Sequence, residues 1–407
     1  MNILFVTPYV PSRIRVRPFH IISELSKRHD VHVVALRDVD KSRIPGGEDL
    51  IASSRSIRVV PHSDLRGFIQ SLAAVPTRSP MCTAYCRSGR MRRVIDDMVS
   101  ERKFDVVHVE HLRGAHFAPL GRGLPVVLDS VDCLTRLFSQ MTQSRSGLAG
   151  RLVAAEEAWK LRRYEPRILK CFDHVLVTSE SERDALLGLD QALRIDIVPN
   201  GVDTEYFAPQ GAHRKPARLV FSGKMSYLPN VEAVLWFADN VLPALRREFP
   251  DLEFVIVGSG PPPQVIKLSA MPGVSVTGYV EDIRPYLDAS AIAVAPVRTS
   301  VGVQNKILEA MAMALPVVTS TAARASIGEC AGVLAADDAE DFVSVVSQLV
   351  KEPARAAQLG RLGREEVVGR FSWHQSAVQL EAIYEEVLRD FRGSRHSRSS
   401  VSLEDRT

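Results

Sequence analysis

Short apolar runs and stretches of helical spacing alternate along the first half of the chain. Residues 3–6 form an apolar run that ends in a Thr-Pro turn signal, and Phe19, Ile22 and Leu25 then follow at helical spacing. A second apolar run spans 31–36. This order of strand, helix and strand predicts parallel strands joined by a right-handed crossover. Further strands are predicted at 57–60, 106–109, 126–128 and 175–178.

The second half repeats this pattern after a break. Turn-forming residues at 200–203 (NGVD) and a polar stretch at 210–216 mark the boundary. Strands are predicted at 219–222, 254–258, 274–276, 291–295 and 317–318, and helices at 230–249, 283–289, 306–314 and 339–349. We therefore predict an α/β protein with two doubly wound domains that face a cleft, since parallel sheets bind ligands outside the carboxyl ends of their strands.

The predicted domains cover 1–198 and 199–371. An amphipathic helix within 372–392 is expected to cross back to the first domain, and the Ser- and Arg-rich tail 393–407 is expected to be disordered.

Composition places the chain among ordinary globular proteins, with 45% apolar and 24% charged residues. No apolar run approaches the roughly 20 residues of a membrane span, and the N-terminus lacks signal-peptide features, so we expect a cytoplasmic protein. The five cysteines are scattered, which favours neither disulfides nor a closed zinc site. The net charge is only +3, but the first 100 residues hold 16 Lys and Arg against 9 Asp and Glu.

Familiar nucleotide and metal motifs fail in detail. A dinucleotide fingerprint begins at Gly258, but Pro263 replaces its third glycine. Gly223 and Lys224 are followed by Met225 rather than by the Ser or Thr of a P-loop. The sequence HVEH at 108–111 violates the helical spacing of zinc proteases, and DVD at 38–40 is expected to be a solvated turn. We therefore predict no metal site.

The segment 301–318 offers a different way to bind a nucleotide. Gly302 permits close backbone approach, and Asn305 is expected to cap a helix that begins near Lys306. The start of such a helix attracts a diphosphate through its free amides and dipole, and Lys306 adds a full charge. Glu309, one turn later, is placed to accept hydrogen bonds from the two hydroxyls of a ribose.

With these residues the chain resembles the retaining glycosyltransferases of family 4, which have the GT-B fold of two Rossmann-like domains. The resemblance rests first on 306–312 (KILEAMA) with 316–318 (PVV). Other segments match in family order: 198–203 (VPNGVD), 221–223 (FSG), 255–258 (VIVG), 278–280 (GYV) and 371–373 (FSW). Within the family, 223–230 (GKMSYLPN) and 304–306 (QNK) resemble a subgroup associated with bacterial exopolysaccharide or cell-surface assembly.

The resemblance implies sugar transfer from a nucleotide diphosphate sugar to a hydroxyl, with retention and without a metal or cofactor. The first domain would bind the acceptor, a glycan or a lipid-linked saccharide, and the second the donor. Donor contacts would come from Gly223, Lys224, Val280, Gly302, Asn305, Lys306 and Glu309. Lys306, Glu309 and Asp132 are the candidate catalytic residues.

Four departures from the family pattern change these expectations. Val301 stands where the family has the first of two glutamates, and Lys224 alone remains of an Arg-Lys pair. The family histidine after the strand at 126–128 is absent, so Asp129 or Asp132 is expected to orient the acceptor hydroxyl. A glycine pair after the first strand is replaced by 12–17 (SRIRVR). The replacement makes three arginines candidates for phosphate or acceptor contact: Arg13, Arg15 and Arg17.

The local basic surplus suggests peripheral contact with an anionic membrane surface. The candidate stretch combines arginines with apolar neighbours: Arg87, Arg90, Met91, Arg92, Arg93 and Val94. Nucleic-acid binding is disfavoured because aromatic residues are not interleaved with these basic residues. Three alternatives stay open, namely a nucleotide-sugar epimerase, a glycan phosphorylase and a non-catalytic nucleotide-sugar-binding protein.

Overall fold

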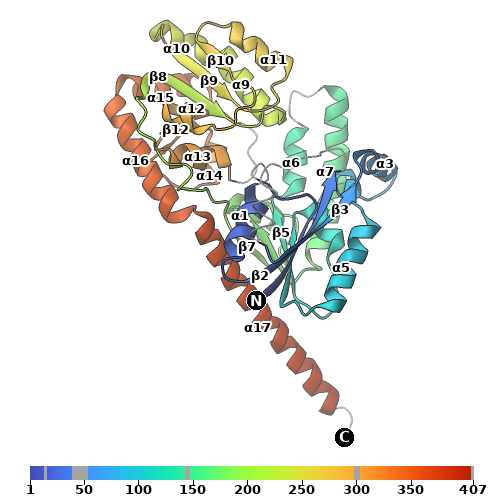
Figure 1. Cartoon of the computed structure of the whole chain (residues 1–407). Coiled ribbons are helices and arrows are strands. Elements are labelled where there is room, and N and C mark those ends of the chain that lie inside the picture. Colours follow the sequence, from blue (N-terminus) through green and yellow to red (C-terminus); the bar gives the residue numbers. More distant parts are fainter. Residues whose placement is uncertain (13–15, 39–53, 143–146, 298–302, 405–407) are drawn as a thin grey trace. The chain divides into compact units, whose positions relative to one another are not determined.

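A computed structural model describes residues 1–12, 16–38, 54–142, 147–297 and 303–404. The chain forms two compact units (Figure 1). Unit 1 combines Met1–Pro199 with Trp373–Thr407, and unit 2 is Asn200–Ser372. The carboxyl-terminal segment is therefore part of the first unit.

Unit 1 contains a seven-stranded sheet whose strand pairs are all parallel. Its spatial order is β3-β2-β1-β4-β5-β6-β7, so the strand order reverses between β1 and β4. The strands are β1 (Asn2–Thr7), β2 (Asp30–Asp38), β3 (Ser56–His62), β4 (Val106–Glu110), β5 (Val126–Val131), β6 (His174–Val177) and β7 (Ile195–Ile197).

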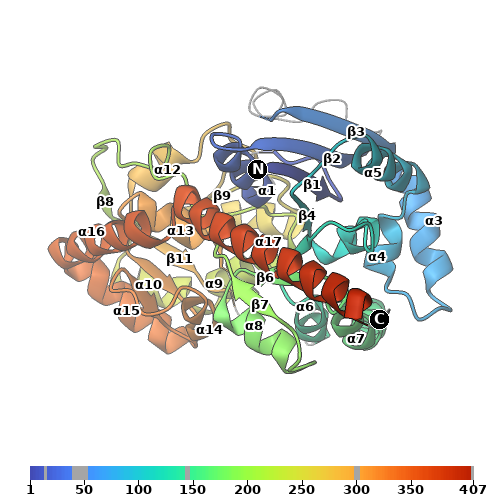
Figure 2. The same ribbon diagram turned by 90° about the horizontal axis from the view of Figure 1, so that it is seen from below.

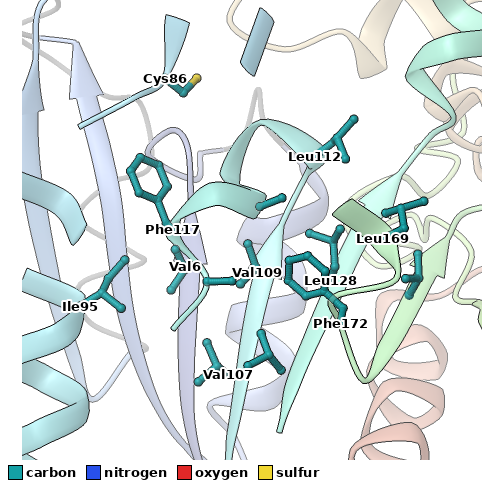
Figure 3. Packing of buried hydrophobic residues seen from close by; sticks show 14 of the residues in the cluster. Val6, Cys86, Ile95, Val107, Val109, Leu112, Phe117, Leu128, Leu169 and Phe172 are labelled. Atoms are coloured by element: carbon teal, nitrogen blue, oxygen red, sulfur yellow. The ribbon is translucent and has the colours of Figure 1, made fainter. Parts of the chain in front are cut away.

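Helices cover both faces of this sheet. Successive side chains of a strand point to opposite faces, so Ile3 and Phe5 pack into one apolar cluster and Leu4 and Val6 into the other (Figure 3 shows the second cluster). The described helices are α1 (Val16–Leu25), α3 (Asp64–Ala74), α4 (Met81–Tyr85), α5 (Gly89–Glu101), η1 (Leu112–Phe117), α6 (Leu134–Met141), α7 (Leu148–Leu169), α8 (Glu180–Leu187) and α17 (Trp373–Glu404).

The long helix α17 packs against α1 within unit 1 (Figures 1 and 2). Trp373 stacks on His20 with ring centroids 5.1 Å apart, and Leu380 and Tyr384 are fully buried. The helix continues to Glu404, through most of the segment expected to be a disordered tail. No proline interrupts this segment, arginine favours a helix, and serine disfavours one only weakly.

Unit 2 contains a six-stranded parallel sheet in the order β10-β9-β8-β11-β12-β13. Its strands are β8 (Lys215–Ser222), β9 (Glu253–Val257), β10 (Val274–Val276), β11 (Ser290–Ala295), β12 (Val317–Thr319) and β13 (Val333–Ala335). Its helices are α9 (Leu228–Asn240), α10 (Leu242–Glu248), α11 (Pro263–Ile266), η2 (Lys267–Ala270), α12 (Arg284–Asp288), α13 (Asn305–Ala312), α14 (Thr321–Ala325), α15 (Ala339–Lys351) and α16 (Pro353–Arg370). The strand order reverses between β8 and β11, at the position equivalent to the reversal in unit 1.

The predicted α/β class is confirmed, with two differences in detail. The helix expected over 230–249 is two helices, α9 and α10, with a break at Val241. Pro243 accounts for the break, because proline fits the first turn of a helix but not its interior. The short strands β7 and β13 lie outside the strands that the sequence predicts; each is an edge strand of only three residues, which gives a weak sequence pattern.

Candidate functional site

Helix α13 is fixed in unit 2 by its apolar face and by its carboxyl end. Ile307, Leu308 and Met311 are fully buried in the cluster on one face of the sheet. Arg214 donates hydrogen bonds to the carbonyl oxygens of Met313 and Ala314 at 2.6 and 2.7 Å. Since a guanidinium also complements the negative end of the helix dipole, this end of α13 is neutralised.

The amino end of α13 is not neutralised in this way. The helix begins at Asn305, with Gln304 rather than Asn305 at the cap position, so the expected cap is displaced by one residue. Within the part of the chain that the structure describes, the backbone N–H groups of Asn305 and Lys306 donate to no acceptor. The Oδ1 atom of Asn305 is buried without a hydrogen-bond partner. Free donors and the positive dipole end favour an anion here.

Lys306 is held in place by two residues of neighbouring elements. Its ammonium donates a hydrogen bond to Oδ1 of Asn230 on α9 and lies 4.8 Å from the ring centroid of Phe221 at the end of β8. Asn230 is buried, and its amide donates to the carbonyl oxygen of Lys224 at 2.9 Å. Burial lowers the pKa of Lys306 to about 8, although Glu309 acts in the opposite direction. The lysine therefore still carries positive charge near neutral pH.

Glu309 lies one turn further along α13. Burial raises the pKa of its carboxyl group to about 7, and the nearby Lys306 opposes this shift. No hydrogen bond or ion pair joins the Glu309 carboxylate to any residue in the described ranges. The structure thus places an acceptor without a protein donor close to a constrained cation.

Two glycines bring the loops after β8 and β9 together. Gly223 and Gly258 have φ angles of +153° and +154°, and a Cβ atom on Gly258 would lie 1.8 Å from the carbonyl oxygen of Gly223. A Cβ atom on Gly223 would lie 2.8 Å from Nδ2 of Asn230. Only glycine permits these approaches, so Gly223 secures the position of the Asn230 and Lys306 pair. Gly258, the start of the failed fingerprint, has a packing role.

The remaining predicted donor residues differ in their surroundings. Lys224 is exposed and contributes its carbonyl oxygen to Asn230. Val280 is partly buried and packs on the cluster that contains α13. Gly302, and with it Val301, lies outside the described residues.

Unit 1 has a polar cluster at its own strand-order reversal. Arg17, at the start of α1, binds Asp129 of β5 through Nε and Nη2, both at 2.8 Å, and both side chains are buried. Arg17 is therefore bound to a carboxylate inside the unit, and the phosphate or acceptor contact that the sequence predicts for it would have to compete with Asp129. Arg13 and Arg15 lie outside the described residues.

Three residues of this cluster are of types that commonly bind metal ions. Ligand atoms of His108, Glu110 and Asp129 lie within 4.8 Å of one another. The Arg17 guanidinium already binds the Asp129 carboxylate, so a metal ion placed there would be repelled by the positive charge of Arg17. Burial raises the pKa of Glu110 to about 7 and lowers that of His108 to about 4. The cluster fits an internal ionic network better than a cation site.

The HVEH motif at 108–111 does not reveal this network when it is compared with helical metal-binding motifs. The helical spacing of a zinc protease does not apply to His108 and Glu110, because they are alternate residues of β4 and point to the same face. Tyr384 of α17 contacts Nδ1 of His108 at 2.7 Å, and Tyr9 donates to Glu110 at 3.2 Å. Alternation within a strand was the signal that could have found the pair.

Asp132, the other predicted acceptor residue, is partly exposed, whereas Asp129 is fully buried. Burial raises the pKa of Asp132 to about 7, and Glu182 adds to the shift. The preceding residue, Val131, has a φ angle of +68°, which is strained for a β-branched residue. Backbone strain of this kind clusters at functional sites, which favours Asp132 over Asp129 as the accessible carboxyl group.

Comparisons with known proteins match both units. The family model described as "Glycosyl transferase 4-like domain" matches residues 14–201, and the model "Glycosyl transferases group 1" matches 216–352. The chain is similar to the MMP alpha-(1->4)-mannosyltransferase of Mycolicibacterium hassiacum. The two are 26% identical over 310 residues, which cover 70% of this chain and 71% of the relative.

Solved structures show the same architecture at low sequence identity. Sucrose-phosphate synthase from Thermosynechococcus elongatus superposes with a TM-score of 0.67 at 16% identity, over 96% of this chain and 100% of that chain. HepE from Anabaena, solved in complex with UDP, gives a TM-score of 0.62 at 14% identity, over 95% and 100% of the two chains. At these identities the likeness shows a shared fold, and substrates do not follow from it.

Proposed function

Since the chain belongs to the family 4 glycosyltransferases with the GT-B fold, we propose that it transfers a sugar from a nucleotide diphosphate sugar to a hydroxyl group with retention. The acceptor class that we propose is a glycan or lipid-linked saccharide of bacterial polysaccharide or cell-surface synthesis. The resemblance of 223–230 and 304–306 to an exopolysaccharide subgroup supports this choice. The comparisons do not favour the epimerase or the non-catalytic alternative.

The amino end of α13 carries the proposal. Two backbone N–H groups without described acceptors lie beside an ammonium that Asn230 and Phe221 hold in place. Because the N–H groups, the dipole and the ammonium all favour negative charge, they form a binding site for a diphosphate. Glu309, one turn away, would accept hydrogen bonds from the ribose hydroxyls of the same nucleotide.

The same groups would assist the chemistry. During transfer, the acceptor oxygen bonds to the anomeric carbon as the bond from that carbon to the diphosphate oxygen breaks. Negative charge grows on the leaving diphosphate, which takes up the proton of the acceptor hydroxyl. Lys306 and the amides of α13 are already positioned, so they stabilise this charge without reorganisation. Val301 supplies no carboxylate where the family has one. Stabilisation of the leaving diphosphate therefore has to contribute more of the rate acceleration. On the acceptor unit, Asp132 is our candidate to orient the attacking hydroxyl.

Calorimetry with UDP, GDP and ADP tests the donor site. One of the three should bind the wild-type chain, and Glu309→Gln should weaken that binding because an amide cannot accept hydrogen bonds from both hydroxyls equally well. Lys351→Met is the matched control for Lys306→Met, because Lys351 lies on α15, which packs on the opposite face of the sheet from α13. Unchanged affinity in both Glu309→Gln and Lys306→Met would exclude this site.

A transfer assay distinguishes the reaction class. With a panel of acceptors, the bound nucleotide's sugar should appear on an acceptor hydroxyl. A changed sugar released without any acceptor would instead indicate an epimerase, and a requirement for orthophosphate would indicate a phosphorylase. Nucleotide binding without any product would indicate a non-catalytic protein.

A further inference from the structure

Helix α3 packs with its small residues inward and its large apolar residues outward. Leu65, Phe68, Ile69 and Leu72 lie at helical spacing on one face and are 68, 58, 56 and 54% exposed. The only fully buried positions of this helix are Gly67 and Ala74. A helix that stabilised only its own unit would bury the larger side chains, since burial of apolar area is the main driving force.

The packing of α3 explains why this face stays outward. A Cβ atom on Gly67 would lie 2.7 Å from the ring of Tyr85, so α3 approaches α4 through a position that has room for glycine alone. Tyr85 also donates a hydrogen bond to Asp64 in the first turn of α3. These contacts fix the rotation of α3 about its axis and leave its apolar face without a described neighbour.

A basic pocket lies where α3 ends. Nζ of Lys160 on α7 donates to the carbonyl oxygens of Ala74 and Val75 at 3.0 and 2.8 Å, which joins α7 to the end of α3. The adjoining pocket has a volume of about 510 Å³ and contains no Asp or Glu among its lining residues. The lining residues are Arg78, Ser79, Arg87, Trp159, Lys160, Arg163, Tyr164 and Arg167.

An apolar stripe leads from this pocket along α7. Leu148, Leu152 and Trp159 follow at helical spacing on one face and are 75, 63 and 53% exposed. Arg163, one turn beyond Trp159, lies 4.4 Å from its ring centroid. The four residues combine exposed apolar area with an adjacent cation, as α3 and the pocket do.

We propose that the exposed face of α3, the apolar stripe of α7 and the arginine pocket form a docking surface for a bilayer of anionic phospholipid. Apolar helix faces bordered by arginines are suited to lie at the boundary between acyl chains and headgroups. The pocket, lined by four arginines and no carboxylate, takes a lipid phosphate group. The inference rests on the proposed function, because a lipid-linked acceptor would be presented at such a surface.

This surface shares Arg87 with the stretch expected from sequence, because Arg87 lines the pocket, but it does not include the apolar residues of that stretch. That expectation placed Met91 of α5 against the membrane beside its arginines, but Met91 is fully buried in the core of unit 1. Val94 is partly buried against the same cluster. Among the described helices none is long and apolar enough to cross a bilayer.

Cosedimentation of the full chain with vesicles tests the proposal. Vesicles of equal parts phosphatidylglycerol and phosphatidylcholine should sediment the wild-type chain, and pure phosphatidylcholine should not. The double variant Phe68→Ser with Ile69→Ser should lose at least about tenfold in binding, since both side chains lose their apolar contact with lipid. Arg78→Gln and Arg163→Gln should each cost roughly fivefold, the effect of one cation near an anionic surface.

Matched controls separate docking from general surface effects. Ile266→Ser changes an isoleucine of unit 2 with 53% exposure, close to the 56% of Ile69, and should bind vesicles as the wild type does. Arg361→Gln, an exposed arginine of α16, is the control for charge. The docking variants should keep nucleoside diphosphate binding, whereas Lys306→Met should lose that binding and still sediment. This pattern distinguishes failure of the docking surface from failure of the donor site.

Three outcomes would overturn the proposal. One is a wild-type chain that does not sediment with the anionic vesicles. Another is binding by Phe68→Ser with Ile69→Ser that equals the wild type. The third is a wild-type dimer in analytical ultracentrifugation that this double variant converts to a monomer, because the face would then be a contact between copies of the chain.

Discussion

Both units place charged residues near the strand-order reversal of their sheet and use them in opposite ways. Each parallel sheet reverses its strand order once, between β1 and β4 in unit 1 and between β8 and β11 in unit 2. In unit 1, Arg17 and Asp129 are buried and bind each other. In unit 2, Lys306 is held by a neutral amide, and Glu309 binds no described residue.

The difference follows from the partners that the chain supplies. A buried guanidinium that meets a carboxylate at 2.8 Å is neutralised within the protein, so it has little charge left for a ligand. Asn230 fixes Lys306 without neutralising it. Equal topology therefore does not imply equal chemistry. The unit suited to a charged ligand is the one whose buried charge is not neutralised by an opposite charge of the protein.

The largest effect that we expect is on the stability of unit 1. Arg17→Met would leave Asp129 buried without its cation and should lower the free energy of unfolding by about 3–5 kcal/mol. Chemical denaturation monitors the loss. Lys215→Met removes one side of an exposed pair with Glu253 and should cost about 1 kcal/mol or less. A small loss in Arg17→Met would show that the unit 1 network is not what stabilises this reversal point.

The second prediction concerns the diphosphate. Lys306→Met should weaken nucleoside diphosphate binding and slow transfer by roughly ten- to a hundredfold, because a charged hydrogen bond contributes about 1.5–3 kcal/mol. Calorimetry and the transfer assay measure the two effects. The unfolding midpoint should change little, since the wild-type ammonium is itself disfavoured by burial. If Lys306→Met bound the nucleoside diphosphate as tightly as the wild type does, the charge of Lys306 would not serve a ligand, and the contrast between the two units would be wrong.

The third prediction is a narrow pH range for binding. Lys306, with a pKa of about 8, loses its charge as the pH rises through that value, and Glu309, with a pKa of about 7, gains a proton as the pH falls. Affinity for the diphosphate should therefore be highest between about pH 7 and 8 and fall by up to about tenfold per pH unit on either side. Calorimetry across this range measures the profile.

Two variants test which residue causes the loss of affinity at high pH and which causes the loss at low pH. Lys306→Arg should remove the alkaline decline, because arginine stays charged throughout. Glu309→Gln should remove the part of the affinity loss at low pH that comes from protonation of Glu309. The part that comes from protonation of the ligand's own phosphate should remain. If both variants retain the wild-type profile, neither residue touches the nucleotide.

Sequence patterns predicted the fold well because both sheets are buried on both faces. Central strands such as 3–6 and 254–258 are continuous apolar runs and are visible without tertiary information. The edge strands β7 and β13 are not predicted, because three residues are too short a pattern to identify a strand. The order of strands in each sheet could not be read from the runs alone.

The candidate site was predicted only as far as local spacing reaches. Lys306 and Glu309 lie one helical turn apart, so sequence placed them together. Asn230 and Phe221 are distant in sequence from Lys306, and only the fold shows that they hold its ammonium. The bond from Arg17 to Asp129 likewise spans 112 positions, which is why Arg17 was expected to be a ligand residue.

The smallest expected effect concerns the other lysine of the donor unit. Lys224 is exposed, so a phosphate contact from its side chain would be screened by water and salt. Lys224→Gln should weaken nucleoside diphosphate binding by no more than about fivefold at low salt, which corresponds to about 1 kcal/mol, and less as salt rises. Lys306→Met should retain more of its loss at high salt, since Lys306 is partly buried and held in place by Asn230. Calorimetry at two ionic strengths compares the variants. An equal, salt-independent loss in both would mean that exposure does not separate the two lysines and that both bind the diphosphate directly.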